Sequence, residues 1–169
     1  EFFEYNFENL EELEEIKFVD PNITIQSLIT TEFATKGILV KSIVPKNMKH
    51  YSFISKEILI EKEIDDNHVI LGSSLAKSIG ADLGTNVKLF SSNTISSPFG
   101  QLPKSMNLEV IGIFDSGMSD YDSSFAFISL KNAQRILSLD DEISVIEVHL
   151  YDPNSTELVK KKIEDKFTD

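Results

Sequence analysis

The chain has 169 residues, of which 41% are hydrophobic and 26% are charged, and its 28 acidic and 16 basic residues give a formal net charge of −12. This composition is typical of a globular domain or of two small ones, while the acidic excess argues against nucleic-acid binding, which needs a basic face, and against unaided adsorption to anionic lipid. The absence of cysteine excludes disulfides, a thiolate nucleophile and Cys-ligated metals.

An acidic amphipathic helix is the first element that the sequence predicts, over residues 7–17, with Asn6 as its N-cap. Its apolar stripe recurs at every third position: Phe7, Leu10, Leu13 and Ile16. We interpret the acidic residues as a solvated face, with a docking patch as the alternative. Pro21 and Asn22 then turn the chain into an alternating strand over residues 23–30, and a second strand, apolar on both faces, follows at residues 37–44.

The clearest local pattern covers residues 69–90, where a short strand leads into a helix from Ser73 that ends in a left-handed cap at Gly80. A strand over residues 86–90 follows. The later elements are a strand (108–114), a polar turn (115–124), a strand (125–130), a helix capped by Ser129, a strand (143–150) and a helix capped by Asp152 with Pro153 at its first position. Strand–helix units thus flank a strand-rich middle, which predicts an α+β fold.

A long segment without periodicity separates two of these strands, over residues 91–107. It contains Pro98, Gly100 and Pro103, with the apolar Phe99 and Leu102 between the prolines. Long structureless loops in compact domains are usually functional, and exposed apolar residues on a projecting element mark protein-binding sites. We therefore expect a projecting loop with both apolar side chains exposed, which another protein grips or receives.

Residues suited to catalysis or metal binding do not form recognisable motifs. The three histidines, His50, His68 and His149, lack the spacing of a metal pair. We interpret His50 and His149 as surface positions and place His68 at a turn beside Asp65 and Asp66. The acids at 115, 120 and 122 do not match a calcium-binding loop, and we interpret them as caps of a polar turn. A nucleophile elbow and a phosphate loop are also missing. We expect no catalytic activity, no metal and no cofactor.

Three stretches in order resemble the periplasmic domain of the lipoprotein-releasing ABC permeases, the LolC/LolE family: VILGSSLAKSIGADLGTNVKLF, LEVIGIFDSGMSDYDSSFAFISLKNAQRIL and DPNSTELVKKKIEDKF. KSIVP resembles the element that precedes the family's insert, and SPFGQLP resembles the proline-flanked hook of the LolC type. The similarity covers residues 37–167. It implies a MacB-like fold with a discontinuous porter-like subdomain (1–33 and 140–169) and an inserted, strand-rich sabre-like subdomain (34–139) that carries the hook at 91–107.

The resemblance also implies a function. The chain would lie on the periplasmic side of the Gram-negative inner membrane, with transmembrane helices outside it, in a permease that extracts lipoprotein cargo with a LolD-like ATPase and a second permease subunit. The hook would hold a soluble LolA-like carrier through Pro98, Phe99, Gly100, Gln101, Leu102, Pro103, Lys104 and Met106. Met106 stands where the family pattern has a basic residue, with Lys104 nearby.

Two other functions remain open on the residues alone. One is the periplasmic domain of a MacB-type efflux permease, which shares the fold but has no need of a proline-flanked hook. The other is a free-standing periplasmic binding or hydrolytic protein, which a signal peptide in the parent gene would identify.

Overall fold

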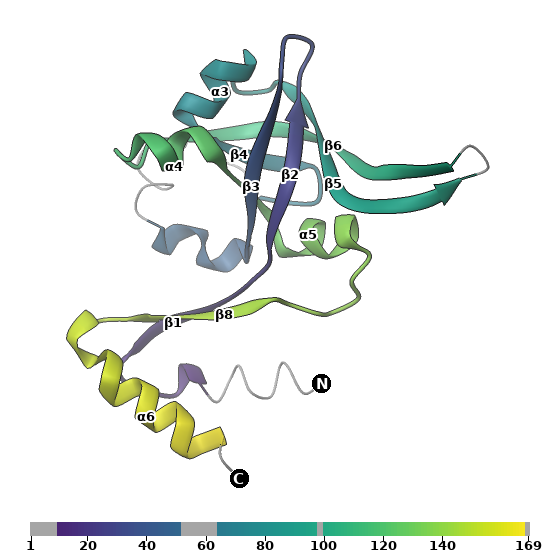
Figure 1. Ribbon diagram of the computed structural model, residues 1–169. Coiled ribbons are helices and arrows are strands. Elements are labelled where there is room, and N and C mark those ends of the chain that lie inside the picture. The colour runs from purple at the N-terminus through teal and green to yellow at the C-terminus, as the bar shows by residue number, and fades with distance from the viewer. Residues whose placement is uncertain (1–9, 52–63, 98–99, 168–169) are drawn as a thin grey trace. The chain divides into compact units, whose positions relative to one another are not determined.

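The computed structural model describes residues 10–51, 64–97 and 100–167. Its elements in chain order are β1 (Ile16–Asn22), β2 (Thr24–Thr30), β3 (Thr35–Ile43), η1 (Pro45–His50), β4 (His68–Gly72), α3 (Ser73–Ile79), β5 (Asn86–Ser97), β6 (Gly100–Phe114), α4 (Ser119–Ser124), β7 (Phe125–Ser129), α5 (Leu130–Leu137), β8 (Val145–Leu150), η2 (Pro153–Ser155) and α6 (Thr156–Phe167) (Figure 1). Strands and helices are both present, as an α+β fold requires.

The chain divides into two compact units. The terminal unit consists of Glu1–Pro21 and Ile146–Asp169, and the barrel unit of Asn22–Val145. The boundaries expected from the sequence lay at residues 33/34 and 139/140. The difference arises at the N-terminal side because β2 pairs with β3 and β5, which places it in the barrel unit.

The barrel unit is a closed sheet in the order β2-β3-β7-β4-β6-β5. Two of its pairings, β3 with β7 and β4 with β6, are parallel, and the others are antiparallel. Alternate residues of β2 such as Ile25 and Ile29 point into the core, as the period of two predicted. The interior of the barrel and the helices packed on it form one apolar cluster.

Helices α3 and α5 pack on the barrel through apolar residues that the sequence identified. Ile79 of α3 and Ile136 of α5 are fully buried. Gly80 ends α3 in the left-handed region, with φ of 64°, and the predicted C-cap is therefore confirmed. The predicted N-cap of α5 is confirmed as well, because the Ser129 hydroxyl accepts a hydrogen bond from the backbone N–H of Asn132 at 3.2 Å.

The terminal unit pairs β1 with β8 and adds α6. Its small core contains Leu10, Ile16, Val19 and Val159. The Asp152 carboxylate accepts a hydrogen bond from the backbone N–H of Asn154, so the predicted cap before the last helix is confirmed, although a 3-10 turn precedes α6.

Two expectations from the sequence are wrong around strand β1. The helix expected over residues 7–17 is wrong at its C-terminal end, because the described helical residues end at Glu11 and Ile16 already begins the strand. Pro21 and Asn22 lie inside β1 and do not form a turn before the next strand. The apolar stripe behind the first expectation has only four residues, spaced three apart. So short a pattern fits a full helix and also a single helical turn that leads into a strand.

Candidate partner-binding site

Strands β5 and β6 continue beyond the barrel as a two-stranded arm, residues 92–97 and 100–107 (Figure 1). Strand β5 pairs with β2 only up to the pair Ser27–Ser91. Strand β6 pairs with β4 only from the pair His68–Glu109 onward. Between these limits the two strands pair with each other, out to the pair Ser97–Gly100. The segment therefore projects from the barrel.

The expectation of a structureless loop is wrong for the described part of this segment. Residues 91–97 contain no proline, and Thr94 and Ile95 are β-branched, so a strand is permitted here although Asn93 does not favour one. Pro103 is tolerated because β6 has a free edge in a two-stranded arm. The register shifts between Phe90 and Thr94, where three residues of β5 stand opposite Lys104 alone. Such an irregularity bends a ladder, and it lies where the arm leaves the barrel.

The residues at the outer end of the arm are exposed. Leu102 keeps 49% of its surface accessible, and Gln101 and Pro103 are exposed as well. Gly100 has a φ of 114°. Residues with a Cβ atom rarely adopt this conformation, so a glycine suits this position near the tip. Pro98 and Phe99, which the sequence also assigned to the site, lie outside the described residues.

Two of the residues assigned to partner binding contact the barrel unit. The Lys104 ammonium donates hydrogen bonds to the Ser138 hydroxyl at 2.7 Å and to the Arg135 carbonyl, at the C-terminal end of α5. Met106 is half-buried and packs against the barrel core. Lys104 and Met106 thus hold the base of the arm, whereas residues 100–103 remain exposed.

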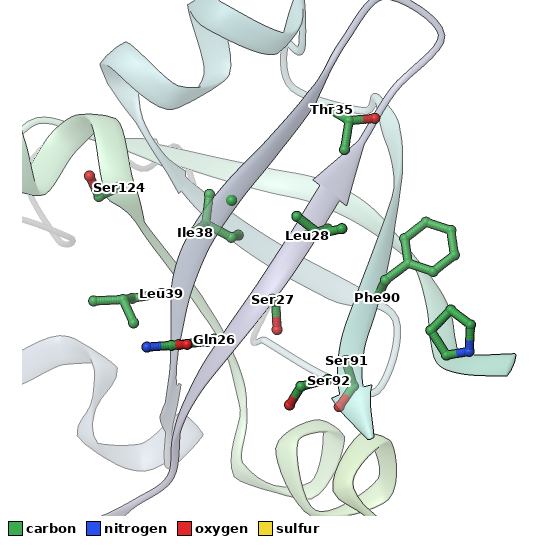
Figure 2. A pocket seen from close by; sticks show the side chains of 12 residues that line it. Gln26, Ser27, Leu28, Thr35, Ile38, Leu39, Phe90, Ser91, Ser92 and Ser124 are labelled. Carbon is green, nitrogen blue, oxygen red and sulfur yellow. The ribbon is translucent and has the colours of Figure 1, made fainter. Parts of the chain in front are cut away.

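An open groove of about 840 Å³ lies at the base of the arm. It is lined by residues of β2, β3 and the middle of β5, together with Pro103 of β6 and Ser124 of α4 (Figure 2). None of its 12 lining residues is charged, although the chain as a whole is strongly acidic. Leu28 of β2 is 49% exposed there and stands opposite Phe90 of β5.

The acidic turn after β6 is held by its own side chains, as the sequence predicted. Buried Asp122 accepts hydrogen bonds from the backbone N–H of Ser116 at 2.9 Å and from its hydroxyl at 2.7 Å. Asp115 accepts one from the backbone N–H of Gly117 at 3.0 Å. Residues 119–124 of this turn form the short helix α4, which the sequence did not predict.

The histidines lie in separate parts of the chain. His68 is buried and contacts the Asp65 carboxylate, with Nδ1 and Oδ1 3.0 Å apart. His149 is half-buried and stacks on Phe18 with ring centroids 4.1 Å apart. His68 therefore adjoins Asp65, as the sequence indicates, whereas the solvent-facing position expected for His149 is wrong. Over the described residues, no group of three or more acids and histidines is placed to hold a metal ion, and no helix is long and apolar enough to cross a membrane.

Comparisons with known proteins identify relatives over most of the chain. The family model for the MacB-like periplasmic core domain matches residues 5–166. The lipoprotein-releasing system transmembrane protein LolC of Neisseria meningitidis is 27% identical over 142 residues, which is 80% of this chain and 34% of that protein. LolC of Xylella fastidiosa is 25% identical over 78% of this chain and 32% of its own. The chain thus spans about a third of the length of these relatives, and the resemblance expected from the motifs is confirmed.

Solved structures agree on the fold. The periplasmic region of MacB from Actinobacillus actinomycetemcomitans has a TM-score of 0.64 at 14% identity, covering 96% of this chain and 71% of that one. The extracellular domain of the ABC-type transporter YknZ from Gram-positive bacteria has a TM-score of 0.63 at 13% identity, covering 96% and 82%. The predicted MacB-like α+β fold class is confirmed.

Proposed function

Because the chain belongs to the family of MacB-like periplasmic core domains, we propose that it is the periplasmic domain of an inner-membrane ABC permease that extracts lipoproteins and passes them to a soluble LolA-like carrier held by the arm. The observation that carries the proposal is the arm itself, a two-stranded extension with an exposed apolar residue, Leu102, near its tip. The similarity to LolC over four fifths of the chain supports the choice of substrate.

The chemistry of the substrate explains why a carrier has to be held. Each methylene of an acyl chain that leaves an apolar environment for water costs about 0.8 kcal/mol. A lipoprotein therefore cannot cross the periplasm unless its acyl chains pass directly from the permease into another apolar site. An arm that binds the carrier before release keeps that site beside the exit.

The structure of the arm favours binding with few contacts. A preformed hairpin loses less conformational entropy on binding than a flexible loop does. The hydrogen bonds of Lys104 to the end of α5 and the packing of Met106 on the core fix its base. The exposed residues 100–103 at its outer end, together with Pro98 and Phe99, form the carrier contact in this proposal.

The other components follow from the same proposal. A LolD-like ATPase in the cytoplasm supplies the energy, and a second permease subunit completes the transporter, both acting through transmembrane helices outside this chain. The domain itself carries out no catalysis and needs no cofactor.

Binding of the carrier by the 169-residue chain tests the proposal. We expect that Leu102→Ser and deletion of residues 98–103 weaken binding of the purified LolA-like carrier of the same bacterium at least tenfold. Leu83→Ser is the matched control, because Leu83 is a similarly exposed leucine (55%) elsewhere in the barrel unit. Melting curves of all variants should agree closely. Full binding by the deletion variant would refute the role of the arm.

A further inference from the structure

The arm presents a strand edge without a pairing partner. Among the described residues, residues 94–97 of β5 pair with β6 alone, and Ser92 and Asn93 lie in the irregularity opposite Lys104. If β2 and β5 kept the register of the pair Ser27–Ser91, Gln26 would face Ser92, but the ladder ends at Ser27. The strands separate there, and the backbone edge of β5 is left open beside the groove of Figure 2.

This edge lacks the charged residues and prolines that usually protect a strand edge, and its irregularity at residues 91–93 lies at the base of the arm. Soluble proteins block free edges with charged residues, lysine above all, or with proline. Residues 91–97, SSNTISS, contain none of these. The β6 half of the arm contains both, as Pro103 and Lys104. Only the β5 edge is therefore a good template for pairing with another strand.

The open edge favours a ligand that supplies hydrogen bonds. Ser27, the last residue of β2 that pairs with β5, lines the groove, and its buried Oγ has no hydrogen-bond partner among the described residues. Its side chain lies on the inward face of β2 with Ile25 and Ile29, so this hydroxyl does not face an added strand. The backbone edge of β5 does, and a ligand that supplies hydrogen bonds would satisfy it, because polar groups that become buried need partners. An acyl chain cannot supply them.

We propose that the β5 edge, residues 92–97, binds an extended segment of the carrier as an added β-strand, so that the arm recognises the carrier through its backbone as well as through its tip. This inference rests on the proposed function. The added strand enters the gap between β2 and β5 with its leading residue beside Leu28 and Phe90. We expect that residue to be apolar and the segment uncharged, since none of the described residues that line the groove is charged. Main-chain hydrogen bonds would supply affinity, and this apolar contact would supply specificity.

Amide hydrogen exchange of the chain with the purified carrier tests the added strand directly. Successive N–H groups of a strand point to opposite edges. We therefore expect every second amide of residues 94–97, where the ladder is regular, to become protected on binding, while those that face β6 change little. Protection of the whole segment or of none of it would overturn the inference.

A pair of lysine variants provides a second test. Thr94→Lys together with Ser92→Lys places charge on the β5 edge, at two exposed positions. The matched control is Ser105→Lys, at an exposed position on β6. We expect the edge variant to weaken carrier binding at least tenfold and the control less than threefold.

The outcomes separate this inference from the proposed function. Loss of binding on deletion of residues 98–103 with full binding by the edge variant overturns the added strand alone. Absence of binding by the unaltered chain overturns both. A fluorescent fatty acid tests the groove for an acyl chain. If the chain binds the fatty acid, the edge variant does not, and the carrier protects no alternate amides, then the groove holds an acyl chain and the inference is overturned. If the unaltered chain dimerises on its own and the edge variant is monomeric, the edge pairs with a second copy of the chain, and the inference is also overturned.

Discussion

Lys104→Met removes the polar connection between the arm and α5. The ammonium donates to the Ser138 hydroxyl and the Arg135 carbonyl at the C-terminal end of that helix. Hydrogen bonds from a charged donor contribute about 1.5–3 kcal/mol when well shielded, but Lys104 is only half-buried. A cation at a helix C-terminus contributes about 0.3–1 kcal/mol. We expect a loss of about 1 kcal/mol in the free energy of unfolding.

A loss of this size is measurable by thermal unfolding. For a chain of this length, 1 kcal/mol corresponds to roughly 2–4 °C in Tm. Lys36→Met is the matched control, because it removes the same charge from an exposed position on β3. We expect carrier binding by Lys104→Met to weaken only about two- to threefold, through a less fixed arm. An unchanged Tm with a tenfold loss of binding would show that Lys104 contacts the carrier and would refute the assignment to α5.

Two further predictions concern the stability of the two units. Gly72→Ala should lower the free energy of unfolding, measured in urea, by about 1–3 kcal/mol, because the new Cβ would lie 2.2 Å from the backbone carbonyl oxygen of Asp122. Gly37→Ala is the control and should be nearly neutral, because its Cβ meets a single side-chain carbon at 4.0 Å. Equal effects of the two substitutions would contradict this reasoning. The hydrogen bond from Lys162 lowers the pKa of Glu15 below its ordinary value of 4.5, so the ionised form is favoured in the folded state. Its stabilising effect should be complete above pH 4.5 and decline as the pH falls through the lowered pKa, and Tm measured against pH should lose this component in Glu15→Gln.

Features set by neighbouring residues in the sequence were predictable. The cap at Gly80 and the cap at Ser129 each depend on a glycine or a hydroxyl beside a short apolar pattern, and both are present. The alternation in β2 also identified its buried face, because burial on one side of a strand follows a period of two. Such signals need no knowledge of what the element packs against.

The arm was not predictable as a hairpin because its pairing is decided elsewhere. Strands β5 and β6 are held in register inside the barrel by β2 and β4, which come from distant parts of the chain. The ladder then extends outward through residues 94–103, whose own sequence has no strong strand pattern. The contact of Lys104 with Ser138 was hidden for the same reason, since 34 residues separate the two.

Because the arm is a continuation of two barrel strands, a carrier bound to it would be held in a fixed direction. A loop joined to the barrel only at its ends could turn freely, and a protein bound to it would face no fixed direction. Strands β5 and β6 run continuously from the barrel into the arm, and Lys104 and Met106 fix the arm's base to α5 and to the core. In the proposed function, the tip residues and the open edge of β5 would set how tightly the carrier binds, and the base would set the direction that it faces relative to the barrel unit. Handover of an insoluble acyl chain needs both, because the carrier's apolar site has to be bound and also pointed at the exit.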